Sequence, residues 1–293
     1  MYRSRFINYL THEKRYSSHT ITAYEMEIVN FLAFVERELV EFDAIDHKLA
    51  RYYFSMMKEE GKAATSINRA ISAVRSYYKF LQRENIVKNN PIRFVHALKT
   101  PKKLPVIVEK DKMTQLLEDW DNTANNFESY RDFIVMELLF GTGIRLSELL
   151  QIKEQDIDFY HKKIRIFGKR SKERFVPLHL TLIDELKHYL SLKKQENPEN
   201  ISDHLVVTKE GKQAYPNLIY RIVHKYLSMI TSQKKKSPHI LRHSFATSLL
   251  DNGADLNSIK ELLGHAGLAA TQVYTHNSAE RLKSIYKQAH PKA

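Results

Sequence analysis

The chain has 293 residues, a length that suits two domains, each able to bury a core of its own. A hydrophobic share of 43% and a charged share of 27% exclude a mainly disordered protein, and a formal net charge of +12 favours nucleic acid as a partner, with a basic surface that serves solubility alone as the alternative. The absence of cysteine excludes disulfides and thiolate zinc sites, and no apolar run approaches the roughly 20 residues of a membrane helix, so we expect a soluble cytoplasmic protein that makes no membrane contact.

Apolar residues in the first third of the chain recur at helical spacing. The pattern predicts one helix after Ser17-Ser18, a second over about residues 49–58 that ends at Gly61, and a third that begins at Thr65-Ser66. These helices predict an all-helical N-terminal domain.

The third predicted helix carries two separate stripes of side chains. Its apolar stripe consists of Ile67, Ala70, Ile71, Val74, Tyr78 and Leu81. Its basic stripe consists of Arg69, Arg75, Lys79 and Arg83. A helix with an apolar back and a basic front can pack inward while its front lies against DNA phosphates, and a solvated charged face is the alternative for the same residues.

The composition changes near residue 90. Asn90-Pro91 and residues 100–105 contain prolines, and each proline disfavours helix in the residue before it. We predict a linker over residues 99–106, between an N-terminal domain of residues 1–98 and a C-terminal domain of residues 107–293. The linker is basic through Lys99, Lys102 and Lys103, so it either crosses a DNA backbone or is simply solvated.

Both predicted domains are basic. Residues 1–98 hold 15 Lys and Arg against 11 Asp and Glu, and the remaining residues hold 31 against 23. This distribution favours a clamp with two basic parts over one basic tail on a neutral body.

The second part of the chain mixes helices with one hairpin. Helices are predicted over residues 112–120 and 129–140, the latter stopped by Gly141-Thr142-Gly143, and a new helix is predicted from Arg145. Strands are predicted over residues 163–167 and 173–177, joined by the turn Gly168 to Lys172, before helices resume. The fold class is therefore mainly α with a small antiparallel hairpin or sheet.

A further predicted helix begins at Ser237-Pro238 and ends at Gly253. Its core-facing residues are predicted to be Leu241, Phe245, Leu249 and Leu250. His239 and Arg242 lie three residues apart near its N-terminus, where the backbone N–H groups and the helix dipole favour an anion such as phosphate. A helix over residues 256–263 follows, and it is closed by Gly264-His265.

Five spaced motifs occur in order along the chain. They are Gly141 to Glu148, Gly168-Lys169, Leu241-Arg242-His243, Leu263-Gly264-His265 and Tyr274. Together they resemble the tyrosine recombinase and integrase family, especially its Xer type, over essentially the whole chain. The resemblance implies a helical, SAM-like core-binding domain and a mixed α/β catalytic domain that form a C-shaped clamp around duplex DNA. It also implies site-specific strand exchange that needs neither ATP, metal nor another cofactor.

The resemblance implies a role for each matching residue. Arg145 and Arg242 look like the two arginines that clamp the phosphate, Lys169 like the hairpin lysine that protonates the leaving 5′ oxygen, and His239 and His265 like the two histidines. Tyr274 looks like the nucleophile that forms the 3′-phosphotyrosyl bond, and Glu148 matches an acidic position that orients Arg145 or the lysine. The turn departs from a common family form at Arg170, where glycine is frequent, so Lys172 is a second candidate for the proton donor.

The chemistry of a phosphodiester asks for the same residue types. Attack by an oxygen spreads negative charge over the equatorial oxygens, so fixed cations stabilise the transition state more than the ground state. Arginine suits this task because its planar fork grips two oxygens and stays ionised. A phenol has an ordinary pKa near 10, so nearby positive charge has to favour the phenolate.

Several alternatives share these features. His239 and His243 stand four apart, but no glutamate follows His239, so the H-E-x-x-H zinc motif is absent. A DNA-binding protein without catalysis, a type IB topoisomerase and a mobile-element integrase remain alternatives to Xer-like resolution of chromosome dimers. The resemblance further implies four identical or mixed protomers on two DNA sites, with a second recombinase or an activator possible, and a helix after Asn277 that docks on a neighbour.

Overall fold

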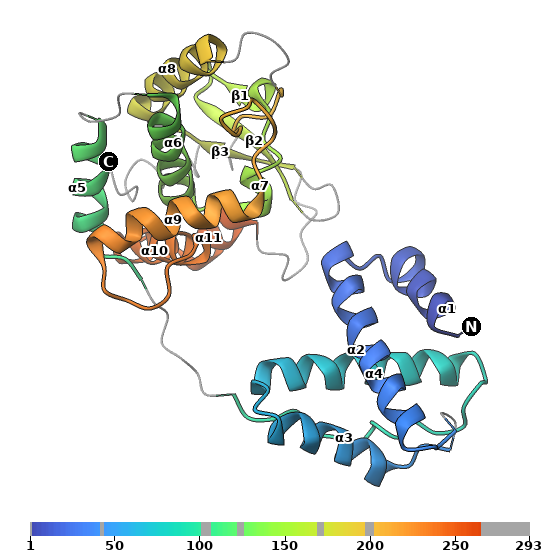
Figure 1. Ribbon diagram of the computed structural model, residues 1–293. Coiled ribbons are helices and arrows are strands. Elements are labelled where there is room, and N and C mark those ends of the chain that lie inside the picture. The colour runs from blue at the N-terminus through green and yellow to red at the C-terminus, as the bar shows by residue number, and fades with distance from the viewer. Residues whose placement is uncertain are drawn as a thin grey trace. The chain divides into compact units, whose positions relative to one another are not determined.

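The computed structural model describes residues 2–41, 44–100, 107–121, 126–168, 173–196 and 202–264 (Figure 1). The chain forms two compact units, Met1–Lys103 and Leu104–Ala293. The boundary between them falls inside the stretch predicted to be a linker, residues 99–106. Within the described ranges, none of the helices combines the length and the apolar character that crossing a membrane requires.

The first unit is helical. Its described elements are α1 (Tyr2–Asn8), the π-helical turn η1 (Tyr9–Glu13), α2 (Ser18–Arg37), α3 (His47–Glu59) and α4 (Ala64–Arg83). The three predicted helices are confirmed as α2, α3 and α4, whereas α1 and η1 are not among the predicted elements. Ser17 caps α2 by accepting from the backbone N–H of Thr20, and Asp46 caps α3 by accepting from that of Leu49.

Helix α4 lies at the centre of this unit and contacts α1, α2 and α3. All six residues of its predicted apolar stripe are buried. Aromatic rings from several helices complete the core, with Phe31 of α2 in edge contact with Tyr53 of α3 and with Tyr78 of α4.

The second unit packs helices around a small sheet. Its described elements are α5 (Lys110–Asp121), α6 (Phe127–Thr142), α7 (Leu146–Leu149), the 3₁₀ turn η2 (Glu154–Asp156), β1 (Ile157–Asp158), β2 (Lys163–Phe167), β3 (Glu173–Pro177), α8 (Leu180–Glu196), α9 (Pro216–Ile230), α10 (Pro238–Asp251) and α11 (Leu256–Leu263). Helix α6 contacts α5, α7, α8, α9 and α10, and it is buried on nearly every side (Figure 1). Because α6 is held on nearly every side, it fixes the position of the turn that follows its C-terminal end.

The sheet is antiparallel in the order β1-β2-β3. The two predicted strands are confirmed as β2 and β3, paired with Ile164 opposite Val176 and Ile166 opposite Arg174. Strand β1 is an additional two-residue strand beside β2. The mainly helical fold with a small antiparallel sheet is thus confirmed.

Helix α10 corrects one predicted core residue. Leu241, Phe245 and Leu249 are fully buried as predicted, but Leu250 is 48% exposed. Residues 241, 245 and 249 recur every four residues along one face, whereas Leu250 lies about 100° further round the helix. The prediction that Leu250 faces the core is therefore wrong.

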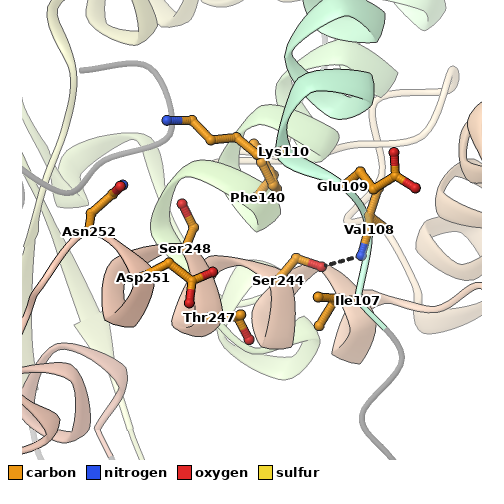
Figure 2. A pocket seen from close by; sticks show the side chains of 10 residues that line it. All are labelled: Ile107, Val108, Glu109, Lys110, Phe140, Ser244, Thr247, Ser248, Asp251 and Asn252. Carbon is orange, nitrogen blue, oxygen red and sulfur yellow. Dashed lines mark hydrogen bonds between the residues drawn. The ribbon is translucent and has the colours of Figure 1, made fainter.

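A small pocket of about 130 Å³ lies between residues 107–110 and the second half of α10 (Figure 2). At its edge the hydroxyl of Ser244 accepts a hydrogen bond of 2.8 Å from the backbone N–H of Val108. The same hydroxyl donates to the carbonyl of Ile240 at 3.0 Å. These bonds tie the start of the second unit to α10, the helix that carries Arg242.

Candidate active site

A tight turn after α6 positions the first arginine. Gly143 ends α6 with φ of 61°, a left-handed conformation that favours glycine. A Cβ atom at this position would lie 2.3 Å from a ring carbon of Phe245, so only glycine fits between α6 and α10. The chain then turns so that Arg145 stands at the N-cap of α7, and the helix begins at Leu146, one residue after the predicted start.

Glu148 fixes Arg145 in this position. The Arg145 side chain donates from Nη1 to Glu148 Oε1 at 2.7 Å, and its backbone N–H donates to Glu148 Oε2 at 2.8 Å. Glu148 is only 5% exposed, so its charge needs buried partners. The predicted role of Glu148 in orienting an arginine stays a prediction, and these two bonds support it.

A second arginine, Arg174, also binds Glu148, and it is not among the residues predicted from the sequence. Arg174 of β3 donates from Nη1 to Oε1 at 3.0 Å and from Nη2 to Oε2 at 2.7 Å. The alternation of buried and exposed residues along β3 could have indicated its role, because Arg174 shares the buried face of the strand with Val176. A charged residue on a core-facing strand position requires a buried partner of opposite charge.

Arg242 approaches the same place from α10. It is 8% exposed, and it donates from Nη1 to the carbonyl of Gly143 and from Nη2 to that of Leu263, both at 2.7 Å. His239 lies three residues earlier, in the first turn of α10, and is exposed. The structure therefore brings Arg145, Glu148 and Arg242 together, with His239 beside Arg242 on the same helix.

The cluster of Arg145, Arg174 and Arg242 carries more positive charge than Glu148 can balance. The pKa of Arg242 is lowered to about 10: burial has the largest effect, the charges of Arg145 and Arg174 also lower the pKa, and Glu148 opposes them. Burial raises the pKa of Glu148, but the hydrogen bonds and charges of Arg174 and Arg145 outweigh it, so that pKa lies below its usual value. A bound phosphate would supply the missing negative charge.

Three of the predicted catalytic residues, Lys169, His265 and Tyr274, lie outside the described residues, as does the alternative donor Lys172. Their roles stay predictions. Strand β2 ends at Phe167, before Lys169, and β3 begins at Glu173, after Lys172. Helix α11 ends at Leu263, and its C-cap Gly264 directly precedes His265.

The basic stripe predicted on α4 has other contacts within the first unit. Arg69 pairs with the buried Glu27, and Arg83 pairs with Glu13 at 2.8 Å and lies over the ring of Tyr9. Arg75 donates to the backbone carbonyls of Ile92 and Val95. These three arginines therefore hold the helical unit together, whatever further contact they make.

Lys79 instead lines a basic cleft of about 1200 Å³ between the start of α3, α4 and residues 86–97. The described lining residues include one carboxylate, that of Asp46, and six basic or imidazole side chains. These are His47, Arg75, Lys79, Lys88, Arg93 and His96. Lys99 is exposed at the end of this unit, and Lys102 and Lys103 lie outside the described residues.

We expect Glu148→Gln to lower the free energy of unfolding of the second unit by about 3 kcal/mol at pH 7, since it leaves Arg174 buried without its counter-charge. The folded-state pKa of Glu148 lies below its usual value of 4.5, so the stability that the carboxylate contributes is complete above that pH and is lost as the pH falls through the folded value. The deficit of the variant should therefore shrink below pH 4.5. Trp120, the single tryptophan of the chain, is buried in this unit and reports its unfolding by fluorescence in denaturant. An equal deficit at pH 7 and pH 3 would contradict the ionised pairing.

Comparison with known proteins identifies the family of this chain. A family model described as the phage integrase family matches residues 106–281, and a model of the phage integrase N-terminal SAM-like domain matches residues 4–85. A tyrosine recombinase XerC of Listeria innocua is 37% identical, covering 99% of this chain and 97% of that protein. A tyrosine recombinase XerD of Staphylococcus haemolyticus is 34% identical, covering 98% of each.

A solved structure of the XerH site-specific recombinase bound to a palindromic difH substrate has the same fold. The TM-score is 0.73, with 24% identity over 90% of this chain and 78% of that one. These matches show that the chain belongs to the phage integrase family and is a DNA strand-cutting and rejoining enzyme. Within that family it is a Xer-like tyrosine recombinase.

Proposed function

We propose that this recombinase cuts duplex DNA at a defined site by attack of Tyr274 and serves in the resolution of chromosome dimers. The observation that supports the proposed cleavage chemistry is that Arg145 and Arg242 lie in one cluster whose positive charge exceeds the negative charge of Glu148. Glu148 holds Arg145 in place. Similarity to proteins named both XerC and XerD supports the biological role.

The proposed reaction is a transesterification. The phenolate oxygen of Tyr274 forms a bond to the phosphorus as the bond from phosphorus to the 5′ oxygen breaks, and the 5′ oxygen takes a proton from Lys169. Arg145 and Arg242 bind the non-bridging oxygens, and His239 and His265 add positive charge near the phenol. The phosphotyrosyl bond conserves the energy of the cut link, so a strand from another duplex can reverse the step without ATP or metal.

We propose a division of labour between residues 1–98, which bind DNA, and residues 107–293, which cut it, joined by the basic linker of residues 99–106. Four protomers would act on two DNA sites, either as copies of this chain or together with a second recombinase. A helix after Asn277 would dock on a neighbouring protomer and couple the active sites of neighbours.

The test uses duplex DNA with a nick close to the cleavage position, so that the short released strand diffuses away and traps the covalent complex. The site is first located by footprinting the protein on its native DNA. A covalent protein–DNA adduct that requires this site supports the recombinase. Site-specific binding without an adduct supports a DNA-binding protein without catalysis, and relaxation of supercoils without a defined site supports a topoisomerase.

We also propose that the basic cleft contacts the DNA backbone. Within the described part of the chain, Lys79, Lys88 and Arg93 have no ion-pair partner, whereas Arg69 and Arg83 do. Unpaired cations release the counterions of DNA phosphates at the least cost, because no internal ion pair has to break.

The double variant Lys79→Ala/Lys88→Ala should weaken DNA binding and reduce the slope of log K against log salt by about 1.8, roughly 0.9 for each lost phosphate contact. The cleavage rate at saturating DNA should not change. Salt titrations of binding measure the slope, with Arg83→Ala as the control, since Arg83 is held by Glu13. A larger change of slope for Arg83→Ala than for the double variant would place the DNA on the predicted α4 stripe instead of the cleft.

A further inference from the structure

Three arginines from three different elements converge on one helix end. Arg174 of β3 donates from Nε to the carbonyl of Leu262 at 3.0 Å, Arg242 of α10 donates to that of Leu263, and Arg145 donates from Nη2 to that of Gly264 at 3.0 Å. These are successive carbonyls at the C-terminal end of α11, where the helix dipole is negative. Two of the three arginines are the proposed phosphate ligands, and the third is Arg174.

We propose that Arg174 is a positioning residue for the cleavage reaction: it holds Glu148 so that the guanidinium of Arg145 keeps both its orientation and its positive charge for the phosphate. This inference rests on the proposed function. At 6% exposure Arg174 is too buried to meet the DNA itself, so it acts through Glu148 and through the end of α11.

The geometry of Glu148 shows how this works. Each carboxylate oxygen accepts one bond from Arg145 and one from Arg174, so the two arginines divide one negative charge. Without Arg174 the carboxylate would turn its whole charge towards Arg145. The resulting neutral pair would attract a phosphate less, and Arg145 would lose the fixed orientation that transition-state binding requires.

Arg174 also packs against the residue that ends α11. A Cβ atom on Gly264 would lie 3.2 Å from Nη1 of Arg174, and Gly264 adopts φ of 65°. The backbone at the C-cap of α11 therefore packs directly against the guanidinium of Arg174. A single side chain thus ties the sheet, the Arg145 turn and the end of α11 together.

If Arg174 only stabilised the fold, it would make the same contacts. The experiment must therefore measure an effect that depends on the negative charge of the substrate phosphate. Single-turnover cleavage is measured on two nicked duplexes, one with an ordinary scissile phosphodiester and one with a methylphosphonate, which lacks the negative charge that Arg145 binds. Arg174→Lys should slow cleavage of the ordinary duplex about 10- to 100-fold, with DNA affinity within about 3-fold of wild type. On the neutral duplex the defect should shrink to about 3-fold or less.

Arg165→Lys is the matched control. Arg165 lies on the neighbouring strand β2 and pairs with Asp156 through bonds of 3.1 and 2.8 Å, and among the described residues no hydrogen bond or ion pair joins it to Glu148. This variant should cleave both duplexes at close to the wild-type rate. An equal defect of Arg174→Lys on both duplexes, or none on either, would overturn the inference.

A second measurement separates this inference from the proposed function. Calorimetric binding of inorganic phosphate to the full chain should weaken about 10-fold in Arg174→Met, but not in Arg165→Met, because without the charge of Arg174 the Glu148 carboxylate turns its whole charge towards Arg145. If the wild type forms no DNA adduct and phosphate binding still depends on Arg174, the proposed function fails and the positioning role stands. If phosphate binding is the same in all variants, the positioning role fails.

Discussion

Tyr274→Phe is expected to abolish covalent capture of nicked duplex DNA, with the rate of strand cleavage falling by at least about 10⁴-fold. In the proposed mechanism the phenol oxygen of Tyr274 forms the covalent link, and losses of this size or larger are found when a catalytic nucleophile is deleted. DNA affinity should stay within a few-fold of wild type, because the phenol hydroxyl is one small contact among many phosphate contacts. Gel analysis of the adduct under denaturing conditions measures the effect.

The control for this variant is another tyrosine of the same unit. Tyr160 is 87% exposed in the turn between β1 and β2, and Tyr160→Phe should form the adduct at the wild-type rate. Peptide mapping of the wild-type adduct then identifies the linked residue directly. An adduct that persists in Tyr274→Phe would show that another residue attacks the phosphorus, and the assignment of the nucleophile would be wrong.

The sequence predicted the parts of this site that local patterns encode. Gly143 and Pro238 mark a helix end and a helix start, so the positions of Arg145 and Arg242 on their elements followed from capping rules. The contact between these two arginines and the end of α11 could not be predicted this way. It depends on how α10 packs on α6, which brings residues about 100 positions apart into hydrogen-bond distance.

A helical wheel shows which side chains share a face but not which neighbour covers that face. On α4 the wheel separated the apolar stripe correctly, but it could not show that Arg69 and Arg83 form ion pairs with Glu27 and Glu13 from other parts of the unit. Arg174 was missed for the complementary reason, since an arginine in a short strand resembles a surface residue until the buried face of the strand is known.

Arg242→Ala is expected to slow cleavage by about 100-fold or more, a loss of roughly 3 kcal/mol of transition-state stabilisation, while DNA binding is retained. A preorganised cation acts mainly on the charge that develops in the transition state, whereas binding sums many backbone contacts. Because the pKa of Arg242 is about 10, the residue is protonated from pH 6 to pH 9, and the loss should be constant over that range.

Arg242→Lys separates charge from geometry in the same assay. Lysine keeps one positive charge but cannot span the carbonyls of Gly143 and Leu263 as the guanidinium does, so we expect a rate between those of wild type and Arg242→Ala. Trp120 fluorescence in denaturant checks that the second unit stays folded, since both carbonyls lose a donor in the alanine variant. Binding and cleavage that fall by the same factor would instead mark Arg242 as a residue of the fold or of DNA docking. A selective loss of cleavage, ordered wild type, lysine, alanine, would show that the fork itself stabilises the transition state.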